Sequence, residues 1–154
     1  MQGIWMFMRD IWIINMKIVL QGNQKFIIRF DKGEDVIKGV EDFMAQGKIT
    51  ACSLFGIGSC SEIELGYYNV NLKEYRKKPY FENMEIISFQ GSGSVLEGKP
   101  TVHAHGMFGK TDFSTLGGHI FKMIVSATCE IFIIQMEGEL KRAFNADANL
   151  NLLQ

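Results

Sequence analysis

Hydrophobic and polar positions change their spacing along the chain. Between residues 36 and 44 the apolar side chains recur at intervals of three and four residues, which is the spacing of one buried face of a helix. Acidic Glu34 and Asp35 suit the positive end of a helix dipole, and Gly47 is typical of a helix stop. The pattern predicts a short strand at residues 25–30, followed by one helix.

After this helix the spacing becomes that of β-strands. Apolar and polar positions alternate, or apolar runs occur without a helical period, in five further segments. These segments are residues 49–57, 62–68, 84–90, 101–108 and 121–136. Residues 131–134 are apolar on both faces and should lie in a central strand, whereas residues 140–153 should form a short turn and a tail packed on the sheet. The chain is therefore predicted to be a sheet-dominated domain.

One domain is expected, because the chain shows no repeat, low-complexity tract or linker. We assign it to residues 17–154 and treat residues 1–16 as an N-terminal extension. The extension is apolar but is interrupted by Arg9 and Asp10, so it fits neither a secretion signal nor a membrane helix. Two interpretations stay open: a segment upstream of a natural start at Met16, or an added edge strand or docked segment.

Net charge bears on the binding partner, and the cysteines bear on the cellular compartment. Lys and Arg number 16 against 17 Asp and Glu, a formal net charge of −1, so nothing predicts long-range attraction to phosphate backbones or anionic membranes. Cys52, Cys60 and Cys129 form no Cys-x-x-Cys pair. We interpret them as reduced and mostly buried, which favours a cytoplasmic protein.

Two of the three histidines share a predicted strand. Side chains alternate between the faces of a strand, so His103 and His105 should point to one side while Val102 and Ala104 face the core. His119 follows a Gly-Gly pair, which permits a tight turn and a close approach of two backbones. All three imidazoles can therefore meet on one surface.

This histidine cluster has two interpretations. Imidazole is the commonest nitrogen ligand of zinc, and three histidines with an open fourth position form the arrangement that zinc uses when it also holds a water or another ligand. Alternatively, His103 and His105 are hydrogen-bonding residues on a wet sheet face, and His119 caps a turn.

Glu130 is a candidate fourth ligand or supporting residue for such a metal. A carboxylate beside an apolar run is costly to bury alone, so it needs a cation, metal, histidine or subunit partner. A salt bridge within the sheet is the alternative interpretation.

Two other segments resemble nucleotide or nucleic-acid motifs. Residues 93–100 fit Gly-x-x-x-x-Gly-Lys, but Pro100 supplies neither the hydroxyl nor the N–H that a phosphate loop needs, so a hairpin loop is expected there. Arg76, Lys77 and Lys78 lie among aromatic residues, a pattern used to bind nucleic acids. A solvated loop with lysine stems lying across aromatic rings explains it equally well. No nucleophile is visibly paired with a base, so an enzyme is the less favoured class.

Six short motifs follow one another in a characteristic order. They are Phe-Asp-Lys-Gly-Glu-Asp at 30–35, Gly-Ile-Gly at 56–58, His-Ala-His at 103–105, Gly-Gly-His at 117–119, Val-Ser-Ala-Thr-Cys-Glu at 125–130 and Leu-Asn-Leu-Leu at 150–153. In this order and spacing, the chain closely resembles the plant and prokaryote conserved (PPC) domain family over about residues 17–154. The histidine pair followed by Gly-Gly-His is the most specific of these features.

The resemblance implies an α/β domain of the α+β type, with a mainly antiparallel sheet flanked by helices. It also implies a homotrimer in which the three histidines group near a cleft between subunits. In plants the domain is joined to AT-hooks, which are Arg-Gly-Arg segments that enter the minor groove, and many bacterial members are called DNA-binding by that association. This sequence holds no Arg-Gly-Arg segment, and fold alone does not transfer the function.

We therefore expect a small trimeric module that binds a metal, zinc foremost, or another ligand through His103, His105 and His119. A DNA-associated regulator that uses the basic residues 76–78, with DNA or a regulatory protein as partner, is the first alternative. A zinc-dependent hydrolase or lyase is the second, and the sequence identifies no substrate for it. No membrane partner is expected.

Overall fold

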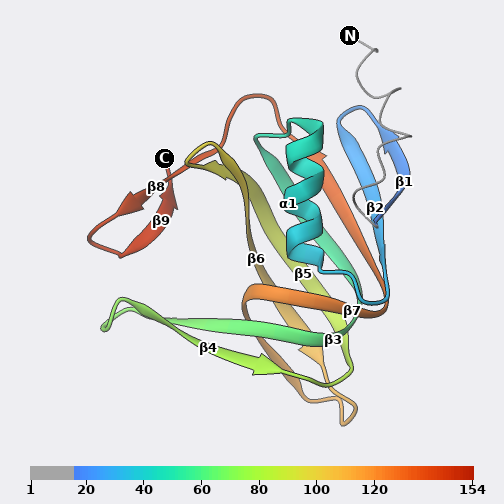
Figure 1. The fold of residues 1–154 in the computed structure, drawn as a ribbon. Coiled ribbons are helices and arrows are strands. Elements are labelled where there is room, and N and C mark those ends of the chain that lie inside the picture. Colours follow the sequence, from blue (N-terminus) through green and yellow to red (C-terminus); the bar gives the residue numbers. More distant parts are fainter. Residues whose placement is uncertain (1–15) are drawn as a thin grey trace.

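The structure, a computed structural model, describes residues 16–154, in which nine strands and one helix follow one another (Figure 1). The strands are β1 (Lys17–Gly22), β2 (Lys25–Asp31), β3 (Cys52–Asn69), β4 (Glu74–Tyr80), β5 (Met84–Leu96), β6 (Lys99–Gly109), β7 (Thr115–Gln135), β8 (Lys141–Asn145) and β9 (Leu150–Leu153). The helix α1 (Val36–Gly47) connects β2 to β3. Both interpretations of the N-terminal extension concern residues 1–15, which lie outside the described residues.

The nine strands form one sheet in which paired strands are antiparallel, except for β5 and β8. The sheet order is β1-β2-β7-β3-β5-β8-β9, with β4 paired to β3 and β6 paired to both β5 and β7. The circuit β7-β3-β5-β6 therefore closes on itself. The mainly antiparallel α+β architecture is confirmed, and one helix rather than several covers the described sheet.

Helix α1 begins and ends where the sequence predicts. Asp35 is its N-cap, and Oδ1 of Asp35 accepts hydrogen bonds from the backbone N–H groups of Ile37 (3.0 Å) and Lys38 (3.3 Å). The helix ends where Lys48 takes a left-handed conformation (φ 51°) and donates its N–H to the carbonyl of Ala45. In residues 16–154, no helix has the length and apolar character needed to cross a membrane.

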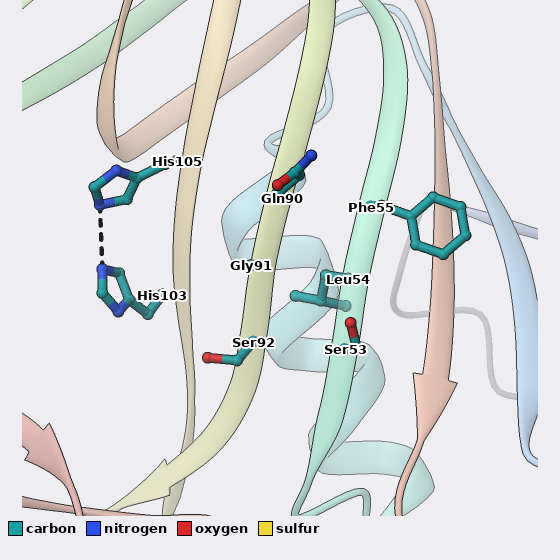
Figure 2. Close-up of a pocket in the computed structure, with 8 residues that line it drawn as sticks. All are labelled: Ser53, Leu54, Phe55, Gln90, Gly91, Ser92, His103 and His105. Carbon is teal, nitrogen blue, oxygen red and sulfur yellow. Dashed lines mark hydrogen bonds between the residues drawn. The ribbon is translucent and has the colours of Figure 1, made fainter.

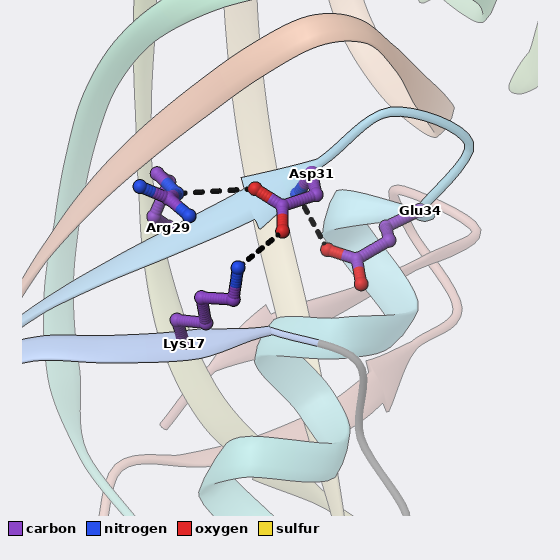
Figure 3. A network of polar contacts seen from close by, with 4 residues as sticks. All are labelled: Lys17, Arg29, Asp31 and Glu34. Carbon is purple, nitrogen blue, oxygen red and sulfur yellow. Dashed lines mark hydrogen bonds and ion pairs between the residues drawn. The ribbon is translucent and has the colours of Figure 1, made fainter.

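A polar network joins β1, β2 and the turn that leads into α1 (Figure 3). The carboxylate of Asp31 accepts from Lys17 Nζ at 2.9 Å and from Arg29 Nε at 3.1 Å. The backbone N–H of Asp31 donates to Glu34 Oε2 at 2.6 Å. The hydrogen bond from Lys17 is the main reason that the pKa of Asp31 lies below its usual value. These contacts hold the edge strand β1 beside the start of the helix.

The hydrophobic core lies between α1 and one face of the sheet. Val40 and Phe43 of the helix are fully buried there, together with Phe30 of β2 and Leu54 of β3. Gly39 permits the close approach, because a Cβ at this position would lie 2.3 Å from Cε1 of Phe30. The three cysteines are unpaired and buried in the same core, as the sequence analysis expects.

The opposite face of the sheet is not covered by the helix. In β3, Leu54 points into the core, whereas Phe55 and Ile57 point away and are 44% and 57% exposed. Phe55 stacks on Phe132 of β7 with ring centroids 4.9 Å apart, and Ile134 lies on the same side. We call the patch of Phe55, Ile57, Phe132 and Ile134 the open face.

Two predicted strands, residues 49–57 and 62–68, prove to be a single strand, β3. Its pairing with β7 shifts register between Gly58 and Cys60 and again two residues later. Such bulges bend a strand without ending it, so the polar residues at the bend do not mark a loop. The long, bent strands β3 and β7 each take part in more than one region of the sheet (Figure 1).

Four strands depart from the sequence prediction. The basic residues 76–78 belong to strand β4. The hairpin predicted at residues 93–100 is confirmed, although only Glu97 and Gly98 form its turn and the other residues belong to β5 and β6. The expected tail after residue 140 is the hairpin β8–β9, and β1 has no counterpart in the prediction. Strands β1, β4, β8 and β9 are largely exposed, so their side chains lack the apolar alternation that identifies a buried strand.

Candidate metal centre

Strand β6 presents two histidines on the side of the sheet that faces away from α1. Val102 and Ala104 are buried in the core, at 8% and 1% exposure, so the alternating His103 and His105 point outward as predicted. Pairing with β5 sets their neighbours, because Ser92 lies opposite His103 and Gln90 opposite His105. Figure 2 shows these residues on adjacent strands.

His119 reaches the pair from strand β7, directly opposite His105 in the β6–β7 ladder. The preceding glycines are extended within β7, so the predicted tight turn is wrong. The predicted close backbone approach is confirmed: a Cβ at Gly117 would lie 2.7 Å from the carbonyl oxygen of Gly106, and one at Gly118 would lie 2.8 Å from that of Gly66. Glycine therefore lets β3, β6 and β7 pack closely enough to bring the three imidazoles together.

The three rings form a nearly equilateral triangle. Ring centroids are 5.2 Å apart for His103 and His105, 5.0 Å for His103 and His119, and 5.5 Å for His105 and His119. One nitrogen from each ring can be chosen so that all three lie within 4.8 Å of one another. The Nε2 atoms of His103 and His105 face each other at 3.3 Å (Figure 2).

These residues fit a tetrahedral zinc ion. With zinc–nitrogen bonds of about 2.0–2.1 Å, two ligand nitrogens lie about 3.3–3.4 Å apart, which matches the 3.3 Å between His103 Nε2 and His105 Nε2. The Nδ1 atom of His119 is buried and has no hydrogen-bond partner among residues 16–154. A buried polar atom without a partner is uncommon and calls for one. The chemistry and spacing of this donor set therefore fit a metal ion, and the 3.3 Å contact is also within hydrogen-bonding distance.

The electrostatic surroundings keep two of the rings neutral. Burial, followed by the charge of Arg142 and the neighbouring His105, lowers the pKa of His103. Burial also lowers the pKa of His119 to about 4, with further contributions from the other two histidines, Lys77 and Arg142. A neutral imidazole is the form that binds a metal, so both rings are ready as ligands near neutral pH.

Arg142 of strand β8 is a member of the site that sequence reasoning missed. Its Nη2 lies 3.2 Å from Nδ1 of His103 and donates to Ser92 Oγ at 3.3 Å. Its Nε donates to the buried Ser94 at 2.9 Å, and its Nη1 to the carbonyl of Asn151 at 3.1 Å. No local motif marks this arginine, because the contact with His103 spans 39 positions of sequence.

A groove runs along the sheet beside the histidines (Figure 2). Its volume is about 500 Å³, and its polar wall is formed by Ser53, Gln90, Ser92, His103 and His105. Phe55 of the open face forms part of the other side. The volume lies in the range of small-molecule sites, about 300–1,000 Å³.

Strands β4 and β7 place aromatic and basic side chains beside His119. The ring centroid of His119 lies 5.1 Å from that of Tyr75 and 4.4 Å from that of Phe121. Lys77 lies over Phe121, 3.7 Å from the ring centroid, and 4.0 Å from the carboxylate of Glu64. A lysine ammonium therefore lies over an aromatic ring, and the basic residues are on a strand and not in the expected loop.

Glu130 is not brought to the three histidines within the chain. It lies on β7, opposite Ile57 of β3 and Arg29 of β2 and eleven residues beyond His119. The described group of possible metal ligands consists of His103, His105 and His119 and does not include Glu130.

The fold and the site together define an α+β domain that carries a three-imidazole centre on one side of its sheet. Residues 19–137 match the sequence model of the Plants and Prokaryotes Conserved (PCC) domain. The chain belongs to this family, the plant and prokaryote conserved domain, for which both abbreviations, PCC and PPC, are used. The resemblance found in the sequence is confirmed.

Several solved structures share this fold over nearly their whole length. A metal-containing protein of Archaeoglobus fulgidus is 34% identical, with a TM-score of 0.81 over 90% of this chain and 98% of that one. A "putative DNA binding protein" of Bacteroides thetaiotaomicron is 26% identical, with a TM-score of 0.87 over 91% and 97%. A PPC protein of Pyrococcus horikoshii is 26% identical, with a TM-score of 0.81 over 90% and 94%. No match was found among curated protein sequences.

The lowered pKa of His119, to about 4, makes the metal-free protein sensitive to acid. Above the ordinary histidine pKa of about 6.5 the ring is neutral in both folded and unfolded chains and contributes nothing. Below it, the unfolded chain takes up the proton first, so the free energy of unfolding should fall between about pH 6.5 and 4, by up to about 1.4 kcal/mol per pH unit. The measurement is urea unfolding of metal-free wild type and metal-free His119→Gln at several pH values in this range. The contribution of His119 is the difference between their free energies of unfolding.

The carboxylates titrate in both proteins, so their contribution cancels in that comparison. The wild-type curve should be the steeper one as pH falls. Parallel curves for the two proteins would show that His119 titrates normally.

Proposed function

We propose that the protein is a metal-binding module in which His103, His105 and His119 hold one divalent transition-metal ion, zinc foremost. The observation that carries the proposal is the triangle of imidazoles, with a 3.3 Å Nε2–Nε2 distance and a buried His119 Nδ1 that lacks a partner. The name of the Archaeoglobus fulgidus relative, a metal-containing protein at 34% identity, supports it. The three free, buried cysteines support a reducing, cytoplasmic location.

The chain's own residues hold and orient the donors. The β6–β7 ladder fixes His105 against His119, and pairing with β5 fixes His103 opposite Ser92. A three-histidine zinc ion, when bound, acts as a Lewis acid with an open coordination position toward a ligand. The polar groove beside His103 and His105 is where such a ligand would enter.

Metal content tests this proposal directly. Protein purified without a histidine tag should contain about one zinc or similar ion per chain by elemental analysis. His105→Ala and His119→Ala should lose most of it, because each removes one of three donors, while their circular dichroism spectra stay unchanged. Occupancy in the wild type should also fall as pH drops below the ordinary histidine range toward about 4, where His119 takes up a proton.

Glu130→Gln is the matched control for these variants. Because Glu130 lies opposite Ile57 and Arg29, this variant should keep its metal. Wild-type protein that stays metal-free after incubation with zinc would contradict the proposal.

We further propose that the protein assembles as a homotrimer through the open face. The number three comes from the family resemblance. Support comes from the apolar side chains of Phe55, Ile57, Phe132 and Ile134, which the helix leaves uncovered. A formal net charge of −1 adds little repulsion between copies. A second copy of this chain is therefore a fitting occupant for the patch.

Light scattering behind size exclusion should give a mass about three times that of the 17.5 kDa chain. Phe55→Lys should shift the protein toward monomer, because it places a charge in the apolar patch and breaks the stacking with Phe132. Phe113→Lys, at a residue 94% exposed and outside the open face, should leave the mass unchanged. Wild-type monomer at micromolar concentration would rule out the trimer.

DNA association is the second candidate function, because the Bacteroides thetaiotaomicron relative is named for it. Arg76, Lys77 and Lys78 are exposed on β4. Strand alternation turns Lys77 toward Phe121 and Glu64, and Arg76 and Lys78 to the other side. The basic charge is divided between two faces, so any attraction to phosphates should be weak and easily screened.

Fluorescence anisotropy with duplex DNA should show weak binding, if any, at physiological salt and a steep loss as salt rises. One variant replaces residues 76–78 by alanine, and a charge-matched control combines Lys32→Ala, Lys38→Ala and Lys99→Ala. The first variant should lose no more of any low-salt DNA binding than the control does. Salt-resistant binding that prefers one sequence, and that only the first variant loses, would make DNA association the leading function.

A further inference from the structure

The guanidinium of Arg142 is a positive charge without a counter-ion beside the three histidines. Its four polar contacts are Ser92 Oγ, Ser94 Oγ, the carbonyl of Asn151 and Nδ1 of His103, and all four are neutral. Among the described residues, no carboxylate forms an ion pair with it. A half-buried cation usually has an anionic partner, so this one is unusual.

The guanidinium is held firmly at the groove. Ser94 is the only fully buried polar side chain of the described residues, and its Oγ accepts from Arg142 Nε at 2.9 Å. Ser92 and His103, which contact Nη2, both line the groove. A guanidinium has five N–H bonds in a planar fork, so four contacts leave one N–H without an acceptor. That N–H belongs to Nη1, which also donates to the carbonyl of Asn151, and it can donate to a ligand that reaches it.

Metal binding should release a second donor. A guanidinium only donates, so Nδ1 of His103 is the acceptor in this structure, and the ring carries its proton on Nε2, which faces His105. If Nε2 of His103 is a metal ligand, the proton of the neutral ring must sit on Nδ1 instead. The N–H on Nδ1 of His103 would then point at an N–H of Arg142 Nη2, and two donors cannot form a hydrogen bond. Arg142 must therefore turn this N–H away from His103.

We infer that Arg142 is the anion-binding residue of the proposed metal site, and that the ligand is a small molecule carrying an oxyanion, either a carboxylate or a phosphate-type group. The inference rests on the proposed function, because it deepens the same site. A planar guanidinium fork matches the paired oxygens of both groups. Three neutral imidazoles do not offset the charge of a divalent ion, so an anion beside Arg142 is the complementary ligand. The groove of about 500 Å³ has room for it.

The experiment uses the full chain loaded with cobalt(II), whose visible absorption reports the ligands around the metal. Acetate and methylphosphonate are titrated in separate arms at constant ionic strength, with chloride as the balancing salt. Wild type should show a saturable spectral change with at least one of the two. Arg142→Gln should weaken that binding about tenfold or more, as expected for loss of hydrogen bonds to a charged group. Its cobalt affinity should not fall, because the guanidinium has to release His103 before Nε2 of that ring can bind the metal.

Lys141→Gln is the matched control, because this neighbouring lysine is exposed and pairs with Glu139. It should leave anion affinity unchanged. Arg142→Lys keeps the charge but loses the fork, so it should bind with intermediate affinity, and it serves if Arg142→Gln does not fold. The arm with the tighter binding identifies carboxylate or phosphate as the source of the oxyanion.

The outcomes separate this inference from the proposed function. A wild-type protein that takes up no cobalt overturns the metal site itself. Two other results would overturn the role of Arg142 but leave the metal site standing. In the first, cobalt-loaded Arg142→Gln binds each anion as tightly as cobalt-loaded wild type does. In the second, cobalt-loaded wild type responds to neither anion. In metal-free wild type, methylphosphonate followed by phosphorus NMR should bind at least about tenfold more weakly, because His103 then retains the guanidinium.

Discussion

The site depends on one steric constraint, the close packing of three strands at glycine positions. Gly117 and Gly118 of β7 pass so near the carbonyls of Gly106 and Gly66 that a side chain at either position would clash. This packing is what places His119 opposite His105 in the β6–β7 ladder and lets the circuit of β7, β3, β5 and β6 close. A larger residue at these positions would separate the strands and with them the imidazoles, whatever the rest of the sheet does.

The grouping of these side chains is unfavourable for the metal-free chain. In the part of the chain that the structure describes, three imidazoles and the guanidinium of Arg142 lie together without a paired carboxylate, and the buried Nδ1 of His119 has no hydrogen-bond partner. An unsatisfied buried polar atom of this kind costs about 1–3 kcal/mol. Natural sequences keep such conflicts mainly where function requires them, and the core between α1 and the sheet is otherwise apolar. The cost is therefore better explained by a ligand than by stability.

The sequence predicted the parts of the site that depend on local pattern. The alternation around His103 and His105 follows from the period of a strand, and α1 follows from its apolar spacing and the acidic residues at its start. The position of His119 was predicted only in outline, because the Gly-Gly pair indicated a close approach but not an extended strand. Arg142 could not be found, since it belongs to an exposed hairpin with no apolar pattern and its contact with His103 depends on tertiary structure.

The three histidines and the polar side chains around them come from different parts of the fold. The histidines lie on β6 and β7 within the closed circuit, whereas Tyr75 and Arg142 come from the two hairpins β3–β4 and β8–β9, which extend from it (Figure 1). The hairpins brace each other, because the hydroxyl of Tyr68 donates to the carbonyl of Ala148 and the Asn149 side chain donates to the carbonyl of Lys73 at 2.9 Å. Changes in the hairpins can therefore alter which ligand is accepted while the imidazole triangle stays intact, which is how one scaffold can serve different ligands.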